Sequence, residues 1–106
     1  MVILDLESLD ELDSRLDKAG DKLIILEFYA PWCGACKMIE NKVKEIALEF
    51  PDILILKIDV EEHEDIAQDY DVAGMPTFVF IKNKVIVNQF SGTKHEKLRE
   101  DIEKYK

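Results

Sequence analysis

The sequence predicts an α/β protein, a three-layer α/β/α sandwich with a central five-stranded mixed sheet and four helices. Apolar runs of strand length alternate with stretches in which apolar residues recur at helical spacing. The last two strand candidates are separated only by a short polar turn, which is typical of a β-hairpin. At 106 residues the chain is long enough for one domain, spanning 1–106, and too short for two.

The individual elements follow from these patterns. Strands are predicted at Val2–Asp5, Lys22–Tyr29, Ile53–Asp59, Thr77–Ile81 and Val85–Phe90, and helices at 9–19, 33–50 and 64–70 and after Thr93. Ser8 with Glu11 predicts a capping box on the first helix, and Thr93 with Glu96 predicts a second on the last. Because crossover helices join parallel strands and a hairpin joins antiparallel ones, the element order predicts a mixed sheet.

The composition excludes several classes of function. A net charge of −9 argues against nucleic-acid binding, which needs clustered Lys and Arg. The chain has no apolar run approaching the roughly 18 residues of a membrane helix, and its N-terminus lacks the basic region of a signal peptide. We therefore expect a cytoplasmic monomer that binds neither nucleic acid nor membranes.

The two cysteines, Cys33 and Cys36, lie where a buried strand gives way to a helix. Two intervening residues on the first helical turn bring the sulfurs within disulfide range. The free N–H groups and the positive dipole end of the helix stabilise a thiolate there. We expect Cys33 to be the exposed nucleophile and Cys36 to be the resolving thiol that attacks the mixed disulfide.

Zinc binding and a purely structural disulfide are the alternatives to redox chemistry at the cysteine pair. A structural zinc site needs four ligands, and the only histidines, His63 and His95, lie on unrelated segments, so no metal site is predicted. An inert structural disulfide is disfavoured in a reducing cytosol. The strand–loop–helix context favours redox chemistry over both.

Glu27 is a single acid within the apolar run LIILEFYA. If its neighbours are buried, burial of the carboxyl raises its pKa. The alternative is that Glu27 faces solvent on an exposed edge of the sheet.

The segment LEFYAPWCGACK, followed by GMPTF and then FSG, resembles the thioredoxin family over essentially the whole chain. The resemblance implies a thioredoxin fold and a protein-disulfide reductase that exchanges Cys33–Cys36 with protein disulfides. It also implies recycling by a thioredoxin reductase that uses NADPH. No cofactor is expected on this chain, which lacks a Gly-rich dinucleotide loop. LEFYAPWCG also resembles protein disulfide isomerase domains, so an oxidase or isomerase is an alternative, as is a redox-gated binding module with little turnover.

The resemblance also implies roles for residues away from the cysteines. Glu27, where thioredoxins carry Asp, would shuttle a proton to and from Cys36, accompanied by Lys57. Met75–Pro76 would be a cis peptide beside the dithiol, unless it is an ordinary trans loop, and the Met75 backbone would pair with an extended substrate segment. The implied substrate-binding residues are Trp32, Gly34, Ala35, Gly74, Met75, Pro76 and Gly92. Gly92 has the alternative role of a bend before the last helix.

Ala35 replaces the proline that is usual between the cysteines of thioredoxins. Alanine keeps the N–H that proline lacks, and we expect that N–H to donate to Cys33 Sγ. The alternative is that it points at water and leaves the reduction potential unchanged. An extra donor stabilises the thiolate, which predicts a reduction potential above the roughly −270 mV of thioredoxin.

Overall fold

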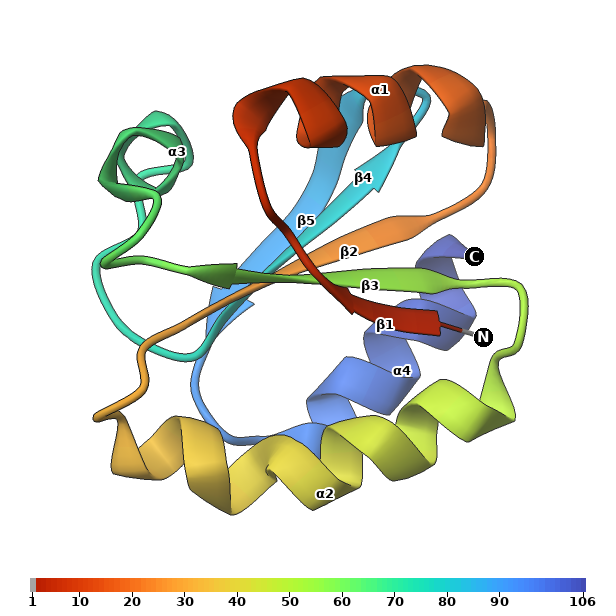
Figure 1. Cartoon of the computed structure of the whole chain (residues 1–106). Helices are drawn as coiled ribbons and strands as arrows, with labels where there is room; N and C mark the ends of the chain where they lie inside the picture. Colours follow the sequence, from red (N-terminus) through yellow and green to blue (C-terminus); the bar gives the residue numbers. More distant parts are fainter. Residues whose placement is uncertain (1) are drawn as a thin grey trace.

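The computed structural model describes residues 2–106 and contains the predicted three layers (Figure 1). In chain order the elements are β1 (Val2–Asp5), α1 (Leu9–Ala19), β2 (Ile24–Tyr29), α2 (Gly34–Glu49), β3 (Leu54–Asp59), α3 (Glu64–Asp69), β4 (Thr77–Lys82), β5 (Val85–Ser91) and α4 (His95–Tyr105). Helices α1 and α3 cover one face of the sheet, and α2 and α4 cover the other. Within residues 2–106, no helix is both long and apolar enough to span a bilayer.

The five strands lie in the order β1-β3-β2-β4-β5, so β2, β3 and β4 are interior. β1 and β2 run parallel to β3, while β4 is antiparallel to both β2 and β5. The hairpin turn places Asn83 and Lys84 at φ of 53° and 65°, the left-handed conformation of both residues in a type I′ hairpin loop. The mixed sheet is therefore the one predicted.

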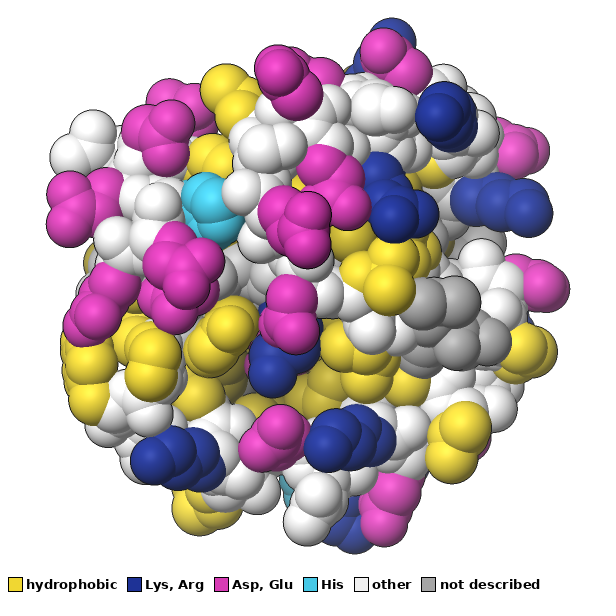
Figure 2. All heavy atoms as spheres, in the orientation of Figure 1, with side chains coloured by type: hydrophobic (Ala, Val, Ile, Leu, Met, Phe, Trp, Pro, Cys, Tyr) yellow, Lys and Arg dark blue, Asp and Glu magenta, His cyan; other side chains and the backbone are white. Residues whose placement is uncertain are grey.

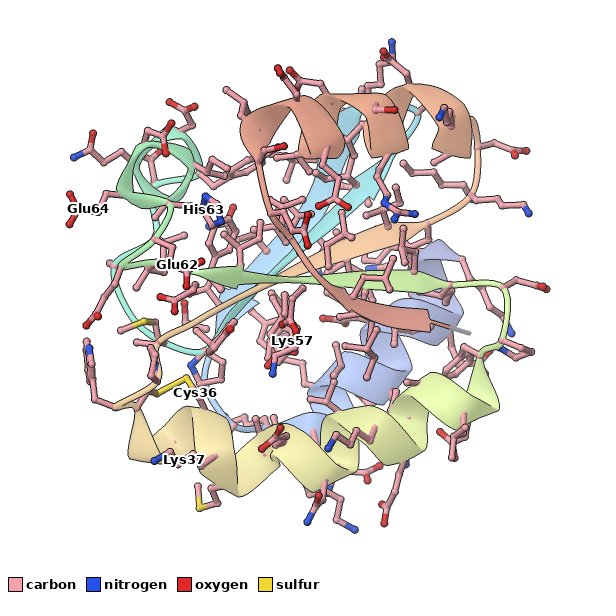
Figure 3. All side chains as sticks on the ribbon, viewed as in Figure 1. Cys36, Lys37, Lys57, Glu62, His63 and Glu64 are labelled. Carbon is pink, nitrogen blue, oxygen red and sulfur yellow. A yellow bond between two sulfur atoms is a disulfide. The ribbon has the colours of Figure 1, made fainter. Side chains whose placement is uncertain are left out.

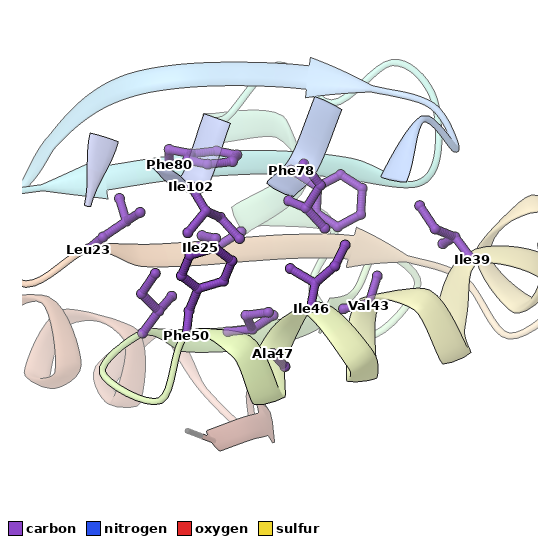
Figure 4. Packing of buried hydrophobic residues seen from close by; sticks show 13 residues of the cluster. Leu23, Ile25, Ile39, Val43, Ile46, Ala47, Phe50, Phe78, Phe80 and Ile102 are labelled. Carbon is purple, nitrogen blue, oxygen red and sulfur yellow. The ribbon is translucent and has the colours of Figure 1, made fainter. Parts of the chain in front are cut away.

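Each face of the sheet has its own hydrophobic core, because successive side chains of a strand point to opposite faces. Ile25 of β2 packs with Ile46 of α2 and Ile102 of α4 on one face (Figure 4). Leu26, the next residue of β2, packs with Leu12 of α1 on the other. β2 is thus covered on both sides, which explains its almost uninterrupted apolar sequence.

The predicted helix caps are confirmed only in part. Ser8 Oγ accepts the Glu11 N–H at 3.1 Å, as expected, but the Glu11 carboxylate accepts from Glu7 N–H at 2.8 Å instead of from Ser8. The predicted Thr93 cap is wrong: α4 is preceded by Lys94, and no side chain caps it. A cap at Thr93 requires the helix to begin at Lys94, but α4 begins at His95. The Glu96 carboxylate, which would complete the capping box, instead accepts a hydrogen bond from Arg99 at 2.6 Å.

Candidate redox site

The cysteine pair lies at the carboxyl end of β2, where the chain turns into α2. Cys33 is the N-cap of α2, with extended backbone, and Cys36 is in its first turn. Their Cα atoms are 5.3 Å apart and their sulfurs form a disulfide. The spacing therefore produces the disulfide geometry that it predicted.

The start of α2 supplies a hydrogen-bond donor to the sulfur of Cys33. Cys36 N–H donates to Cys33 Sγ at 3.1 Å, the bond that an N-cap side chain makes to the third helical residue. Because this bond and the helix dipole both favour negative charge, they stabilise a thiolate on Cys33 when the disulfide opens.

Both cysteines are 7% exposed, so the expected difference in exposure is wrong. What differs is their surroundings: Cys33 Sγ lies 3.9 Å from the Met75 carbonyl oxygen, whereas Cys36 faces a cleft shared with Glu27.

The donor to Cys33 is one residue further along the helix than expected. Within residues 2–106, the backbone hydrogen bond to Cys33 Sγ comes from Cys36, and Ala35 N–H makes none to that sulfur. Ala35 is half-buried and packs against the cysteines, while Gly34 is exposed at the first helical position. The reason is geometric: an N-cap side chain reaches back to either the second or the third N–H, and here it takes the third.

Glu27 is buried, with 3% of its surface exposed. Its strand lies between β3 and β4, so the alternative of an exposed sheet edge is wrong. Burial raises the pKa of Glu27 to about 7; Lys57 opposes that rise, and the negative charges of Glu40 and Asp5 add to it. A carboxyl group with this pKa can both accept and release a proton near neutral pH.

Lys57 lies beside Glu27 in the parallel pairing of β2 and β3. Its side chain is 22% exposed and extends from β3 toward α2 (Figure 3). The Nζ atom is 3.9 Å from Glu40 Oε1 and 4.5 Å from the centre of the Tyr29 ring. Within residues 2–106, the ion pair of Lys57 is made with Glu40, not with Glu27.

A cleft of about 160 Å³ joins these groups. It is lined by Glu27, Tyr29, Ala30, Pro31, Cys36, Lys37, Glu40 and Lys57. Cys36 and the buried carboxyl group of Glu27 therefore line the same cleft, which opens to solvent. Two larger hollows, of about 480 and 690 Å³, lie at the opposite end of the strands and include none of the predicted site residues.

The loop before β4 brings the remaining predicted residues to the disulfide. Met75–Pro76 is a cis peptide, as the resemblance implied, and Met75 packs against the cysteine pair. Thr77 is buried, and its Oγ1 donates to the Gly74 carbonyl and shares a 2.7 Å hydrogen bond with Ser91 Oγ. Gly92 N–H donates to the Pro76 carbonyl at 2.9 Å. These bonds fix the loop to the end of β5.

The position of Gly92 is consistent with both of its expected roles. Its φ of 123° suits glycine, and it follows β5 directly, so it is a bend. Its hydrogen bond to Pro76 also makes it a neighbour of the cis peptide.

Trp32 is 64% exposed beside the disulfide, and its Nε1–H donates to the Glu61 carboxylate. That bond orients the indole ring across the surface next to Cys33. Figure 2 shows acidic side chains gathered over α3 and the loop before it, next to an apolar area at the start of α2.

Residues 2–106 hold no cluster of His, Cys, Asp and Glu suited to a metal ion.

Three residues of this site were not predicted from the sequence. Thr77 and Glu61 act through hydrogen bonds to residues that were predicted, and Glu40 through its ion pair with Lys57. Glu40 could have been predicted from helical spacing, because it lies four residues after Cys36 and so near the same face of the helix. Nothing local marks Glu61 or Thr77.

A strand–disulfide–helix unit beside a cis proline defines a thiol–disulfide oxidoreductase with a thioredoxin fold, and comparison with known proteins agrees. A family model described as Thioredoxin matches residues 5–104. The chain is 45% identical over 97 residues to thioredoxin of Ophiophagus hannah, covering 92% of each chain. It is 46% identical over 97 residues to Thioredoxin-T of Drosophila melanogaster, covering 91% of this chain and 62% of that protein.

Solved structures give the same result. Fasciola hepatica thioredoxin superposes with a TM-score of 0.92 at 40% identity, covering 96% of this chain and 98% of that one. The reduced thioredoxin pre-protein of Schistosoma mansoni superposes with a TM-score of 0.94 at 33% identity, covering all of both chains. The chain belongs to the thioredoxin family, and it is a protein thiol–disulfide oxidoreductase. The matches do not favour the isomerase alternative.

Replacing Ala35 with proline tests how many N–H donors the sulfur of Cys33 uses. The substitution removes the Ala35 N–H but leaves the observed bond from Cys36. If the reduced thiolate also accepts from Ala35, the variant becomes more reducing and the pKa of Cys33 rises, with about 30 mV for each 1.4 kcal/mol lost. Equilibration of both proteins in a glutathione buffer measures the potentials. Equal potentials would show that the Ala35 N–H does not stabilise the thiolate.

Proposed function

We propose that this chain reduces the disulfides of protein substrates in the cytoplasm, and that a thioredoxin reductase drawing on NADPH recycles it. The observation that carries the proposal is the disulfide at the start of α2, with a buried carboxyl in the cleft behind Cys36. The dithiol is the working form, which suits a compartment that keeps thiols reduced. The protein acts as a monomer and needs no bound cofactor.

The reaction begins with the Cys33 thiolate, stabilised by the Cys36 N–H. It attacks one sulfur of the substrate disulfide, forms a mixed disulfide and releases the other substrate sulfur as a thiolate, which takes up a proton. Cys36 must then lose its proton to become a nucleophile. The Cys36 thiolate attacks Cys33 Sγ, releases the second substrate thiolate and restores the Cys33–Cys36 disulfide.

Glu27 is the base that takes the proton from Cys36. The two residues line one cleft, and a pKa of about 7 leaves Glu27 partly ionised at neutral pH. Lys57, beside Glu27 in the sheet, stabilises the ionised carboxylate. Water entering this small polar cleft gives the proton a path to solvent.

The substrate lies across the surface between Trp32 and the cis-proline loop. Because Met75 precedes Pro76 at the start of a strand, its backbone groups can pair with an extended segment of the substrate. Trp32 supplies exposed apolar area, and Gly34, Ala35, Gly74 and Gly92, which are exposed or half-buried, complete the surface around the disulfide. Pro76 is buried, and its part is to hold the cis peptide that follows Met75.

Reduction of insulin disulfides, with thioredoxin reductase and NADPH, tests this function. We expect continuous NADPH oxidation that depends on this chain and on insulin. Binding of partners without turnover would support a redox-gated binding module instead. Repair of scrambled disulfides that is faster than NADPH-coupled reduction would support an isomerase.

A further inference from the structure

The ammonium group of Lys57 shares the Cys36 cleft with two carboxyl groups. Glu27 projects from β2 and Glu40 from α2, and both line the cleft that Cys36 and Lys57 also line. Lys57 reaches across this space from β3 toward α2 (Figure 3). One cation is therefore placed where two acids compete for it.

The two acids differ in their access to water. Glu27 is 3% exposed, whereas the side chain of Glu40 is 47% exposed. Ionisation of the buried Glu27 therefore carries a cost of desolvation. Within residues 2–106, Lys57 is paired with Glu40, whose Oε1 is 3.9 Å from Lys57 Nζ, and not with Glu27. The Tyr29 ring, 4.5 Å from the ammonium, supports the lysine in this position.

We propose that Glu40 is a positioning residue for the exchange reaction: it holds the Lys57 ammonium at the outer edge of the cleft and so withholds positive charge from Glu27. The inference rests on the proposed role of Glu27 as the base for Cys36. Glu40 thereby sets the pH at which the base becomes ionised and the resolving step becomes fast.

The other charged groups around this cleft do not replace Glu40. Apart from Glu40, the titratable groups near Glu27 are Lys57 of β3, Tyr29 of β2, Asp5 of β1, and Lys37 and Lys44 of α2. Lys44 Nζ lies 3.7 Å from Glu40 Oε1, so Glu40 is shared by two lysines. Asp5 and Glu40 both raise the pKa of Glu27, but among residues 2–106 only Glu40 is paired with Lys57.

Titration of the Glu27 carboxyl by carbon NMR in the oxidised protein tests the proposal, because neither thiol titrates in that form. Glu27→Gln identifies the signal. We expect Glu40→Gln to move the midpoint of Glu27 to lower pH, because it removes a negative charge and releases Lys57 toward Glu27. Glu45→Gln is the matched control, since Glu45 is an exposed acid on the same helix that pairs with Lys42 at 3.3 Å. A shift no larger than that of Glu45→Gln would overturn the proposal.

A double-mutant cycle separates positioning of Lys57 from the charge of Glu40 itself. Lys57→Met alone should raise the midpoint of Glu27, because Lys57 lowers its pKa. In the Lys57→Met background, Glu40→Gln should cause less than half of the shift that it causes in the wild type. Equal shifts in both backgrounds would show that Glu40 acts only through its own charge, and the positioning role would be lost.

The pH profile of mixed-disulfide resolution distinguishes failure of this inference from failure of the proposed function. If Glu27→Gln leaves the profile unchanged, Glu27 is not the base. If Glu27→Gln removes the titration but Glu40→Gln leaves it in place, only the role of Glu40 is wrong. We expect the Glu40→Gln profile to follow the NMR midpoint to lower pH.

Discussion

Cys36→Ser is expected to trap this protein on its substrates as mixed disulfides, while Cys33→Ser abolishes reaction with them altogether. The reason is the division of roles at the start of α2. Cys33 Sγ accepts the Cys36 N–H and lies beside Met75, where a substrate segment would pair, so it attacks first. Without Cys36, nothing resolves the bond that forms. Turnover in the insulin assay should fall to the uncatalysed background for both variants.

Mass spectrometry of the reduced protein after iodoacetamide treatment gives an independent measurement. Both cysteines are 7% exposed in the disulfide form, so we expect thiolate character to decide which of them is labelled. We expect the Cys33 adduct to form first. Preferential labelling of Cys36, or covalent trapping by Cys33→Ser in place of Cys36→Ser, would reverse the assignment.

Glu27→Gln is expected to stabilise the fold at neutral pH and to slow the resolving step. Burial raises the pKa of Glu27 from 4.5 in the unfolded chain to about 7 in the fold. Between these values the unfolded state binds fewer protons than the native state, so the stability of the wild type falls as pH rises. The whole displacement corresponds to about 3 kcal/mol, lost progressively from pH 4.5 upward and fully lost above pH 7.

Denaturant unfolding of wild type and variant at several pH values measures this effect. The glutamine variant should match the wild type near pH 3, where the carboxyl is protonated in both states, and exceed it by up to about 3 kcal/mol at pH 8. The exposed acid Glu45, replaced by glutamine, should show no such divergence. A constant difference at all pH values would mean that the change acts through packing and not through ionisation.

Most of the fold could be predicted from local sequence patterns. The apolar runs of β2 and β3 predict buried strands although Glu27 and Lys57 lie within them, and the polar turn at Lys82–Lys84 between two further runs predicts the hairpin, because these signals lie within a few residues of each other. The missed cap at Thr93 shows the limit of a local pattern. The Thr93 and Glu96 spacing is correct for a cap, but Arg99, one turn further on, takes the carboxylate.

The cysteine pair could also be predicted, since a two-residue spacing at a helix start determines its own geometry. The surroundings of the pair depend on long-range packing that no local pattern encodes. Cys33 Sγ contacts Met75, which is 42 residues away in the chain, and the indole of Trp32 is held by Glu61, 29 residues away.

The charge environment of Glu27 shows the same division. The apolar run predicts that the carboxyl is buried, and the raised pKa follows from that burial. Which acid binds Lys57 depends on how α2 packs across β3, and it is Glu40 rather than Glu27. Burial of a strand residue can be predicted from its apolar neighbours in sequence, whereas the distance between two charges on different elements is set only when those elements pack.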